Sequence, residues 1–153
     1  DQADETSGET VAFVAQTLRE DYTDSAYAVY GNLILARQQL MQEGNAEAAV
    51  DSLKWALDKT GEHEALALVV RNRLARAQFS AGQYEEALAT IDGADNADAF
   101  AAMYSELRGD ILLAQGDKEG AREAYLAARE QSQQGRSGIL ELKLADLGVG
   151  EDA

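Results

Sequence analysis

Apolar residues recur three and four positions apart along most of this chain, a period typical of α-helices that bury one face. A clear stripe is formed by Leu33, Ala36 and Leu40, and similar stripes follow it. Together they predict three pairs of helices, in residues 25–43 with 46–59, 62–81 with 84–91, and 97–115 with 118–132. A further helix is expected before these pairs. A last amphipathic helix is expected to cover the end of the stack through Ile139, Leu142, Leu144 and Leu147.

A glycine separates the two helices of each pair, at Gly44, Gly82 and Gly116. Glycine readily adopts the left-handed backbone conformation that ends a helix, so each of these residues predicts a tight turn. The turns are 38 and 34 residues apart, which is in the range of helical-hairpin repeats.

Small residues follow each turn at fixed positions, where the second helix must approach the first closely. The first set is Ala49, Ala87 and Ala121. A second set lies seven positions further on, with a larger residue between the two sets: Ala56, Ala94 and Ala128, with Leu53, Ile91 and Tyr125 between. This threefold register predicts that the helices of each pair pack in the same way.

These patterns predict an all-α fold, a tetratricopeptide-like solenoid of three helical hairpins with flanking N- and C-terminal helices. Residues 9–147 are expected to form one such domain, between a disordered tail of residues 1–8 and a C-terminal tail of residues 148–153.

Thr6 and Glu9 are spaced as a capping box for the first helix. Its inner face is expected to contain Val11, Val14 and Leu18. Four further helix starts have candidate N-caps, which are Asp24 or Ser25, Asn45, Asn96 and Asp117.

The charge of the chain restricts its partners. Asp and Glu total 28 against 13 Lys and Arg, which gives a net charge of −15. Such a surface repels phosphate backbones and anionic lipid headgroups, so neither nucleic acid nor direct membrane contact is expected. It favours basic or unfolded protein partners. The chain has no cysteine, so disulfides, thiolate zinc sites and cysteine nucleophiles are excluded.

Candidate catalytic chemistry is sparse. His63 is the only histidine, and a lone histidine at a helix start is most often a surface residue. Acidic pairs such as Glu85 with Glu86 are expected by chance in so acidic a chain, and none has the spacing of a calcium loop. We therefore predict a protein that is not an enzyme and has no cofactor or metal site.

The expected binding surface is the concave face, which the first helix of each pair lines in such a solenoid. Counting from the glycine turns, a protein-binding groove is predicted to contain Ile34, Gln38, Met41, Val69, Asn72, Arg76, Phe79, Met103, Glu106, Asp110 and Leu113. The alternative is that Phe79 and the two methionines only fill the core. Asn72 and Arg76 alone could clamp a terminal carboxylate, so specific capture of a peptide C-terminus is not expected. For Trp55, a core-filling role is favoured over an exposed anchor.

Several short segments, taken together and in order, resemble a known family. They are residues 53–57, 73–76, 82–88, 106–111, 116–117, 121–125 and 142–147. As a set they resemble the soluble domain of the YfgM-type ancillary subunits of the bacterial SecYEG translocon. The resemblance extends over nearly the whole chain from about Tyr22.

The resemblance implies a non-enzymatic binding domain on the periplasmic side of the inner membrane, with a single membrane-spanning anchor upstream of this chain. The implied partners are the SecYEG channel, a PpiD-like periplasmic chaperone and unfolded client polypeptides. The implied role is assistance to secreted or membrane proteins that emerge from the translocon, within a periplasmic chaperone network. An alternative is an architectural scaffold for outer-membrane assembly that binds one folded partner.

Overall fold

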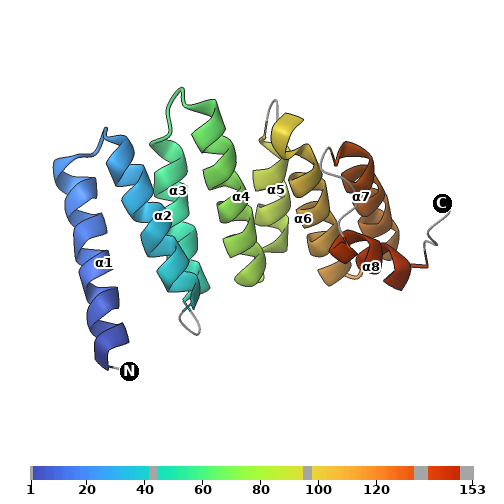
Figure 1. Cartoon of the computed structure of the whole chain (residues 1–153), viewed down its shortest axis with the longest axis horizontal. Helices are drawn as coiled ribbons and strands as arrows, with labels where there is room; N and C mark the ends of the chain where they lie inside the picture. Colours follow the sequence, from blue (N-terminus) through green and yellow to red (C-terminus); the bar gives the residue numbers. More distant parts are fainter. Residues whose placement is uncertain (1, 42–44, 95–97, 133–137, 149–153) are drawn as a thin grey trace. The chain divides into compact units, whose positions relative to one another are not determined.

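A computed structural model describes residues 2–41, 45–94, 98–132 and 138–148. Within these ranges every regular element is helical (Figure 1), which confirms the all-α class. The helices are α1 (Gln2–Asp21), α2 (Ala26–Met41), α3 (Ala46–Asp58), α4 (Glu64–Ser80), α5 (Tyr84–Asp92), the 3-10 helix η1 (Asp98–Phe100), α6 (Ala101–Ala114), α7 (Lys118–Gln131) and α8 (Gly138–Asp146).

The chain forms two compact units, which we call unit 1 (residues 1–83) and unit 2 (residues 84–153). Unit 1 contains α1 to α4, and unit 2 contains α5 to α8. The boundary falls directly after the turn at Gly82, so the two helices of the second predicted pair belong to different units. The single domain predicted for residues 9–147 stays a prediction.

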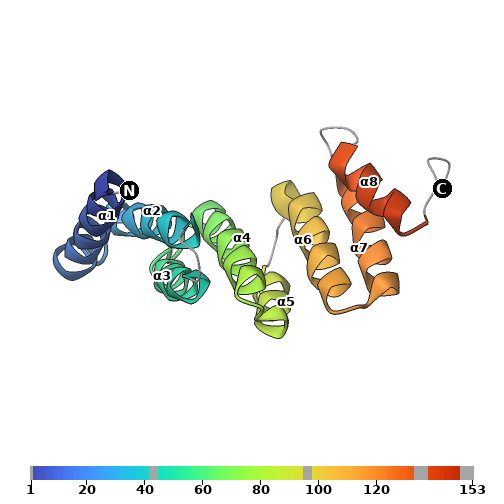
Figure 2. The ribbon, with the colours of Figure 1, turned by 90° about the horizontal axis from the view of Figure 1, so that it is seen from below.

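In unit 1, α3 packs against both α2 and α4, and α1 packs against α2. Figure 2 shows α3 to one side of the row formed by α1, α2 and the start of α4. The apolar faces of α2, α3 and α4 form one buried cluster, made of Val29, Leu33, Ala36, Ala49, Val50, Leu53, Ala56, Val70, Leu74 and Ala77. Helix α1 approaches α2 closely at Gly31, where an added Cβ would lie 2.7 Å from Leu18 Cδ1.

Trp55 lies at the margin of this core. Its side chain is half-buried and packs against the cluster. The guanidinium carbon of Arg19, in α1, lies 4.9 Å from the centre of the Trp55 ring, a cation–π contact. Trp55 therefore fills space within unit 1, as the favoured prediction has it.

In unit 2, α6 and α7 form a closely packed hairpin, α8 packs against α7, and α5 contacts α6. One face of α6 is buried at Tyr104, Leu107 and Ile111. The facing helices bury a cluster made of Ala121, Tyr125, Ala128, Leu140 and Leu144. The third predicted pair is thus a true hairpin, and the last helix covers it.

The glycine turns have the predicted geometry wherever the structure describes them. Gly82 has φ of 74° and Gly116 has φ of 86°. The next residue of each turn donates its backbone N–H back to the helix, from Gln83 to Gln78 at 2.8 Å and from Asp117 to Leu112 at 2.9 Å. These bonds satisfy carbonyl groups that a helix end would otherwise leave free. Gly44 lies outside the described residues.

The alanine register is largely confirmed. Ala49, Ala87 and Ala121 have no exposed surface, and the larger residues Leu53, Ile91 and Tyr125 are buried as well. In the second set, Ala56 and Ala128 are buried. Ala94 differs: it is only half-buried because α5 ends at Asp92, before this position.

Two of the predicted N-caps form capping bonds. Ser25 Oγ accepts from the Tyr27 N–H at 3.2 Å. Asp117 Oδ1 accepts from the Gly120 N–H at 2.9 Å. Asn45 occupies the N-cap position of α3, but its side chain makes no capping bond. Asn96 lies outside the described residues.

Both end helices depart from the prediction. Helix α1 begins at Gln2, so the tail predicted for residues 1–8 is helical from its second residue and Thr6 lies inside the helix. The predicted inner face of α1 is wrong at Val14, which is 48% exposed, because Ala15 is buried instead. In α8 the buried residues are Leu140 and Leu144, whereas the outer face is apolar at Ile139 and Leu142.

Candidate functional site

Helix α2 has apolar residues on two opposite faces. One face packs into the core through Val29, Leu33 and Ala36. The other presents Tyr27, Tyr30, Ile34 and Met41 to solvent, with exposed fractions of 75%, 51%, 59% and 76%. Their spacing of three, four and seven residues places these four side chains in one line along the helix. We call this line the α2 stripe. Such contiguous exposed apolar surface is typical of an interaction site.

A groove lies beside the α2 stripe, within unit 1, and has a volume of about 850 Å³. Helix α2 and the start of α4 form its walls, through Ala26, Tyr30, Leu33, Ile34, Arg37, His63, Glu64, Ala65, Leu66, Val69 and Arg73. Because Tyr30 and Ile34 belong to both features, the stripe and the groove form one continuous surface. Its size is within the range of binding pockets for small ligands or side chains of a partner.

The groove is apolar along its length and charged at its ends. Glu64 lines it beside His63, the residue that precedes α4. Arg37 lines it from α2 and Arg73 from α4. Within the described residues neither arginine has a polar partner, and both side chains are exposed. The groove therefore presents two unneutralised positive charges in a chain whose net charge is −15.

The structure brings together only part of the predicted groove in unit 1. Ile34 and Val69 line the same groove. Gln38 instead lines a separate cavity of about 360 Å³ between α1 and α2. Met41 is exposed on the α2 stripe beyond the groove.

The three other predicted residues of unit 1 lie on α4 outside the groove. Asn72 is buried, so it is unavailable to a partner. It accepts a hydrogen bond from Arg76 Nε at 3.2 Å. Phe79 is half-buried near the end of α4. Asn72, predicted to line the groove, is thus enclosed within the fold of unit 1, at 6% exposure.

Sequence reasoning missed Tyr30, Leu66, Arg37 and Arg73. Tyr30 lies one turn before Ile34 on the same face, so the helical period alone could have identified it. Arg37 had a signal as well, since it stands where this type of repeat usually has an apolar or small residue. The two arginines form a pair only in the folded chain, where α2 and α4 line the same groove.

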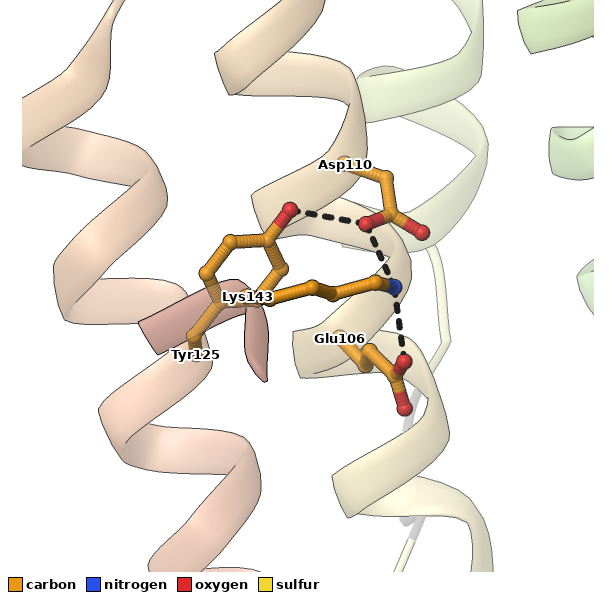
Figure 3. A network of polar contacts seen from close by, with 4 residues as sticks. All are labelled: Glu106, Asp110, Tyr125 and Lys143. Atoms are coloured by element: carbon orange, nitrogen blue, oxygen red, sulfur yellow. Dashed lines mark hydrogen bonds and ion pairs between the residues drawn. The ribbon is translucent and has the colours of Figure 1, made fainter. Parts of the chain in front are cut away.

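In unit 2, the predicted groove residues Glu106 and Asp110 are bound by the chain itself (Figure 3). Lys143 Nζ, from α8, lies 2.7 Å from Glu106 Oε1 and 2.7 Å from Asp110 Oδ1. Tyr125 Oη, from α7, donates to the same Asp110 oxygen at 2.7 Å. These four residues join α6, α7 and α8, so both carboxylates stabilise the packing of these three helices. Met103 and Leu113 of the prediction are 39% and 38% exposed.

This network shifts two pKa values in the same direction. Burial, then the hydrogen bond to Asp110 and the negative charges of Asp110 and Glu106, raise the pKa of Tyr125. For Lys143, burial lowers the pKa, but its hydrogen bonds and attraction to Asp110 and Glu106 outweigh burial and raise it. Both groups therefore hold their protons more tightly in the folded chain.

Unit 2 is accordingly expected to lose stability in alkali. Both pKa values are raised above their unfolded values of 10.0 for tyrosine and 10.5 for lysine. The stabilisation is complete below these values and is lost as pH rises above them. Urea unfolding followed by circular dichroism near pH 8 and above about pH 10.5 should show the loss. The double variant Tyr125→Phe with Lys143→Met should have a smaller pH dependence, and an unchanged dependence would contradict this assignment.

Across the described residues, no group of three or more His, Asp or Glu side chains is arranged to hold a metal ion. In the same ranges, none of the helices combines the length and the apolar character needed to cross a bilayer. His63 lies at the groove and is exposed.

Tight glycine turns, buried alanines after each turn and paired helices define a domain of helical-hairpin repeats. The chain belongs to the family of tetratricopeptide repeat-like domains, whose sequence profile matches residues 1–149. No solved structure matches the chain significantly.

Curated relatives confirm the resemblance predicted from the sequence. The chain is 33% identical over 126 residues to the ancillary SecYEG translocon subunit of Escherichia coli (strain K12), which covers 82% of this chain and 60% of that protein. It is 32% identical over 123 residues to the protein of the same name from Haemophilus influenzae, covering 80% and 59%. A third relative of that name, from Aggregatibacter actinomycetemcomitans, is 33% identical over 99 residues, covering 65% and 48%. The chain thus spans at most about 60% of the length of these relatives.

Proposed function

We propose that this chain is the protein-binding domain of an ancillary translocon subunit and that it binds polypeptide segments in the groove between α2 and α4. One observation supports this most directly: the α2 stripe and the groove form a continuous apolar surface that the described part of unit 1 leaves open. Helical repeats typically bind extended or helical segments on such surfaces. The names of the relatives direct the proposal to SecYEG.

The proposed setting is the periplasmic side of the inner membrane. There the groove would bind a PpiD-like chaperone or a client polypeptide as it leaves the channel. Apolar and aromatic side chains without fixed polar geometry suit ligands of varied sequence, because burial of apolar area is non-directional. The proposed role is therefore binding, and no catalytic step is assigned to any residue.

Photo-crosslinking tests this proposal. A crosslinking amino acid is placed at Ile34 or Val69 in the complete gene product, and inner-membrane vesicles are irradiated during export. We expect adducts with translocon components, a periplasmic chaperone or the exported chain. Matched control positions are Glu47 and Lys54, which are exposed on α3 away from the groove.

Truncation of the stripe should weaken the same interaction. Tyr30→Ala with Ile34→Ala is expected to lower the affinity for the captured partner about five- to thirtyfold, because anchor residues at the centre of an interface typically contribute this much.

In the crosslinking experiment, adducts at Glu47 and Lys54 but not at the groove would place the interface elsewhere. Adducts with a single folded outer-membrane assembly protein would favour the scaffold alternative.

A further inference from the structure

We propose that the groove selects polypeptide segments in which acidic side chains accompany the apolar ones, and that Arg37 and Arg73 recognise the acids. This rests on the proposed function, since it assumes that the groove binds polypeptide. It adds the chemical class of the segment, which the net charge of the chain does not suggest. A net charge of −15 by itself favours basic partners.

The first observation is the pairing of arginines. Most arginines of the described residues have a partner: Arg19 bonds to Asn32, Arg76 to Asn72, Arg108 to Asp92, Arg122 to Glu119 and Arg129 to Glu141, and Arg71 also interacts. In the same part of the chain only Arg37 and Arg73 have none, and both line the groove. Among the described residues no carboxylate pairs with either arginine, so both are available to a ligand.

The second observation is their position along the groove. Helices α2 and α4 run in the same direction, with α3 between them in sequence (Figure 1). Arg37 follows the apolar residue Ile34 by one turn, and Arg73 follows Val69 by one turn. The two arginines therefore lie toward the same end of the groove, and Glu64 lies toward the other. A bound segment would place apolar side chains against Ile34 and Val69 and its carboxylates beside the arginines.

Guanidinium groups suit this role. Arginine is always charged and presents several N–H donors in a fixed plane that matches a carboxylate. Apolar walls beside the two groups lower the local screening by water, which strengthens each pair relative to one in open solvent. Both arginines sit at the rim and stay exposed, so the expected contribution is selectivity of a few-fold to tenfold.

Fluorescence anisotropy with the purified chain tests the selectivity. Three labelled peptides of about 12 residues share the same leucines and an amidated C-terminus, and differ only in having Glu, Gln or Lys at two positions. The Glu peptide is expected to bind about three- to tenfold more tightly than the Gln peptide. Arg37→Gln with Arg73→Gln should remove this difference, and it should weaken binding of the Glu peptide more than binding of the Gln peptide.

A matched control separates the groove from net charge. Lys54→Gln with Lys118→Gln removes the same two positive charges from exposed sites on α3 and α7, outside the groove. This control should leave the preference for the Glu peptide intact. A preference that is equally reduced in the control would overturn the proposal, because it would reflect net charge alone.

The remaining outcomes distinguish the two proposals. Equal binding of the Glu and Gln peptides, insensitive to the arginine variant but weakened by Tyr30→Ala, would overturn the selectivity and keep the groove as a polypeptide site. Tightest binding of the Lys peptide would do the same. A Gln peptide with a free C-terminus that matches the Glu peptide would assign the arginines to a terminal carboxylate and overturn the choice of side chains. Absence of binding by all peptides would count against both proposals.

Discussion

Replacement of Leu53 by alanine is expected to lower the free energy of unfolding of unit 1 by about 3–4 kcal/mol. Leu53 is 1% exposed and lies in α3, the helix that packs against both α2 and α4. Alanine would leave a cavity that neighbouring side chains fill only in part. Trp55 is the single tryptophan of the chain, and it also lies in α3. Its fluorescence during urea unfolding therefore reports on unit 1.

The matched control for this variant is Ile34→Ala. Ile34 is 59% exposed, so its truncation should cost under about 1 kcal/mol. A Leu53→Ala variant with stability close to that of this control would mean that α3 is not the centre of the unit 1 core. Because α3 supports both helices that line the groove, Leu53→Ala should also weaken peptide binding without touching the peptide.

Replacement of Gly109 by alanine is expected to destabilise unit 2 by about 2–3 kcal/mol. Alanine is the better helix former by about 1 kcal/mol, so propensity alone predicts the opposite sign. Packing decides the outcome: an added Cβ at Gly109 would overlap Cε1 and Cδ1 of the Tyr125 ring. That ring is 1% exposed, and its hydroxyl is fixed by Asp110, so it has little room to move.

Thermal unfolding followed by circular dichroism measures this effect. Gly138→Ala is the matched control, because an added Cβ there meets nothing within 4 Å. The control should be neutral or slightly stabilising. In the double variant Gly109→Ala with Tyr125→Ala, the combined loss should be smaller than the sum of the single losses, because the clash is gone. Strict additivity would contradict the proposed overlap.

Much of the fold could be predicted because its signals are local. The stripe of Leu33, Ala36 and Leu40 predicted helix α2 from its period, although Leu40 is 39% exposed in the structure. A glycine after such a stripe predicted a turn. The buried Ala49 and Ala121 followed from that register. The buried face of α1 could not be predicted in the same way. Among the described residues this helix packs mainly against α2, so several of its apolar residues, including Phe13, stay exposed.

The candidate site was predictable only in part, for a different reason. Ile34 and Val69 followed from counting back from the turns. Arg37 and Arg73 lie 36 residues apart, and their shared position depends on the packing of two helices. Similarly, no local pattern indicates that Lys143 binds Glu106, a pair separated by 37 residues. Tertiary packing determines which charged residues of different helices become neighbours, and the period of a single helix does not encode this packing.

The exposed α2 stripe has a consequence for how copies of this chain behave in solution. The exposed residues Tyr27, Tyr30, Ile34 and Met41 can associate with any other apolar surface, including the α2 stripe of another copy. A net charge of −15 opposes such encounters by mutual repulsion. The acidity of the chain thus opposes self-association and keeps the α2 stripe available for its ligand.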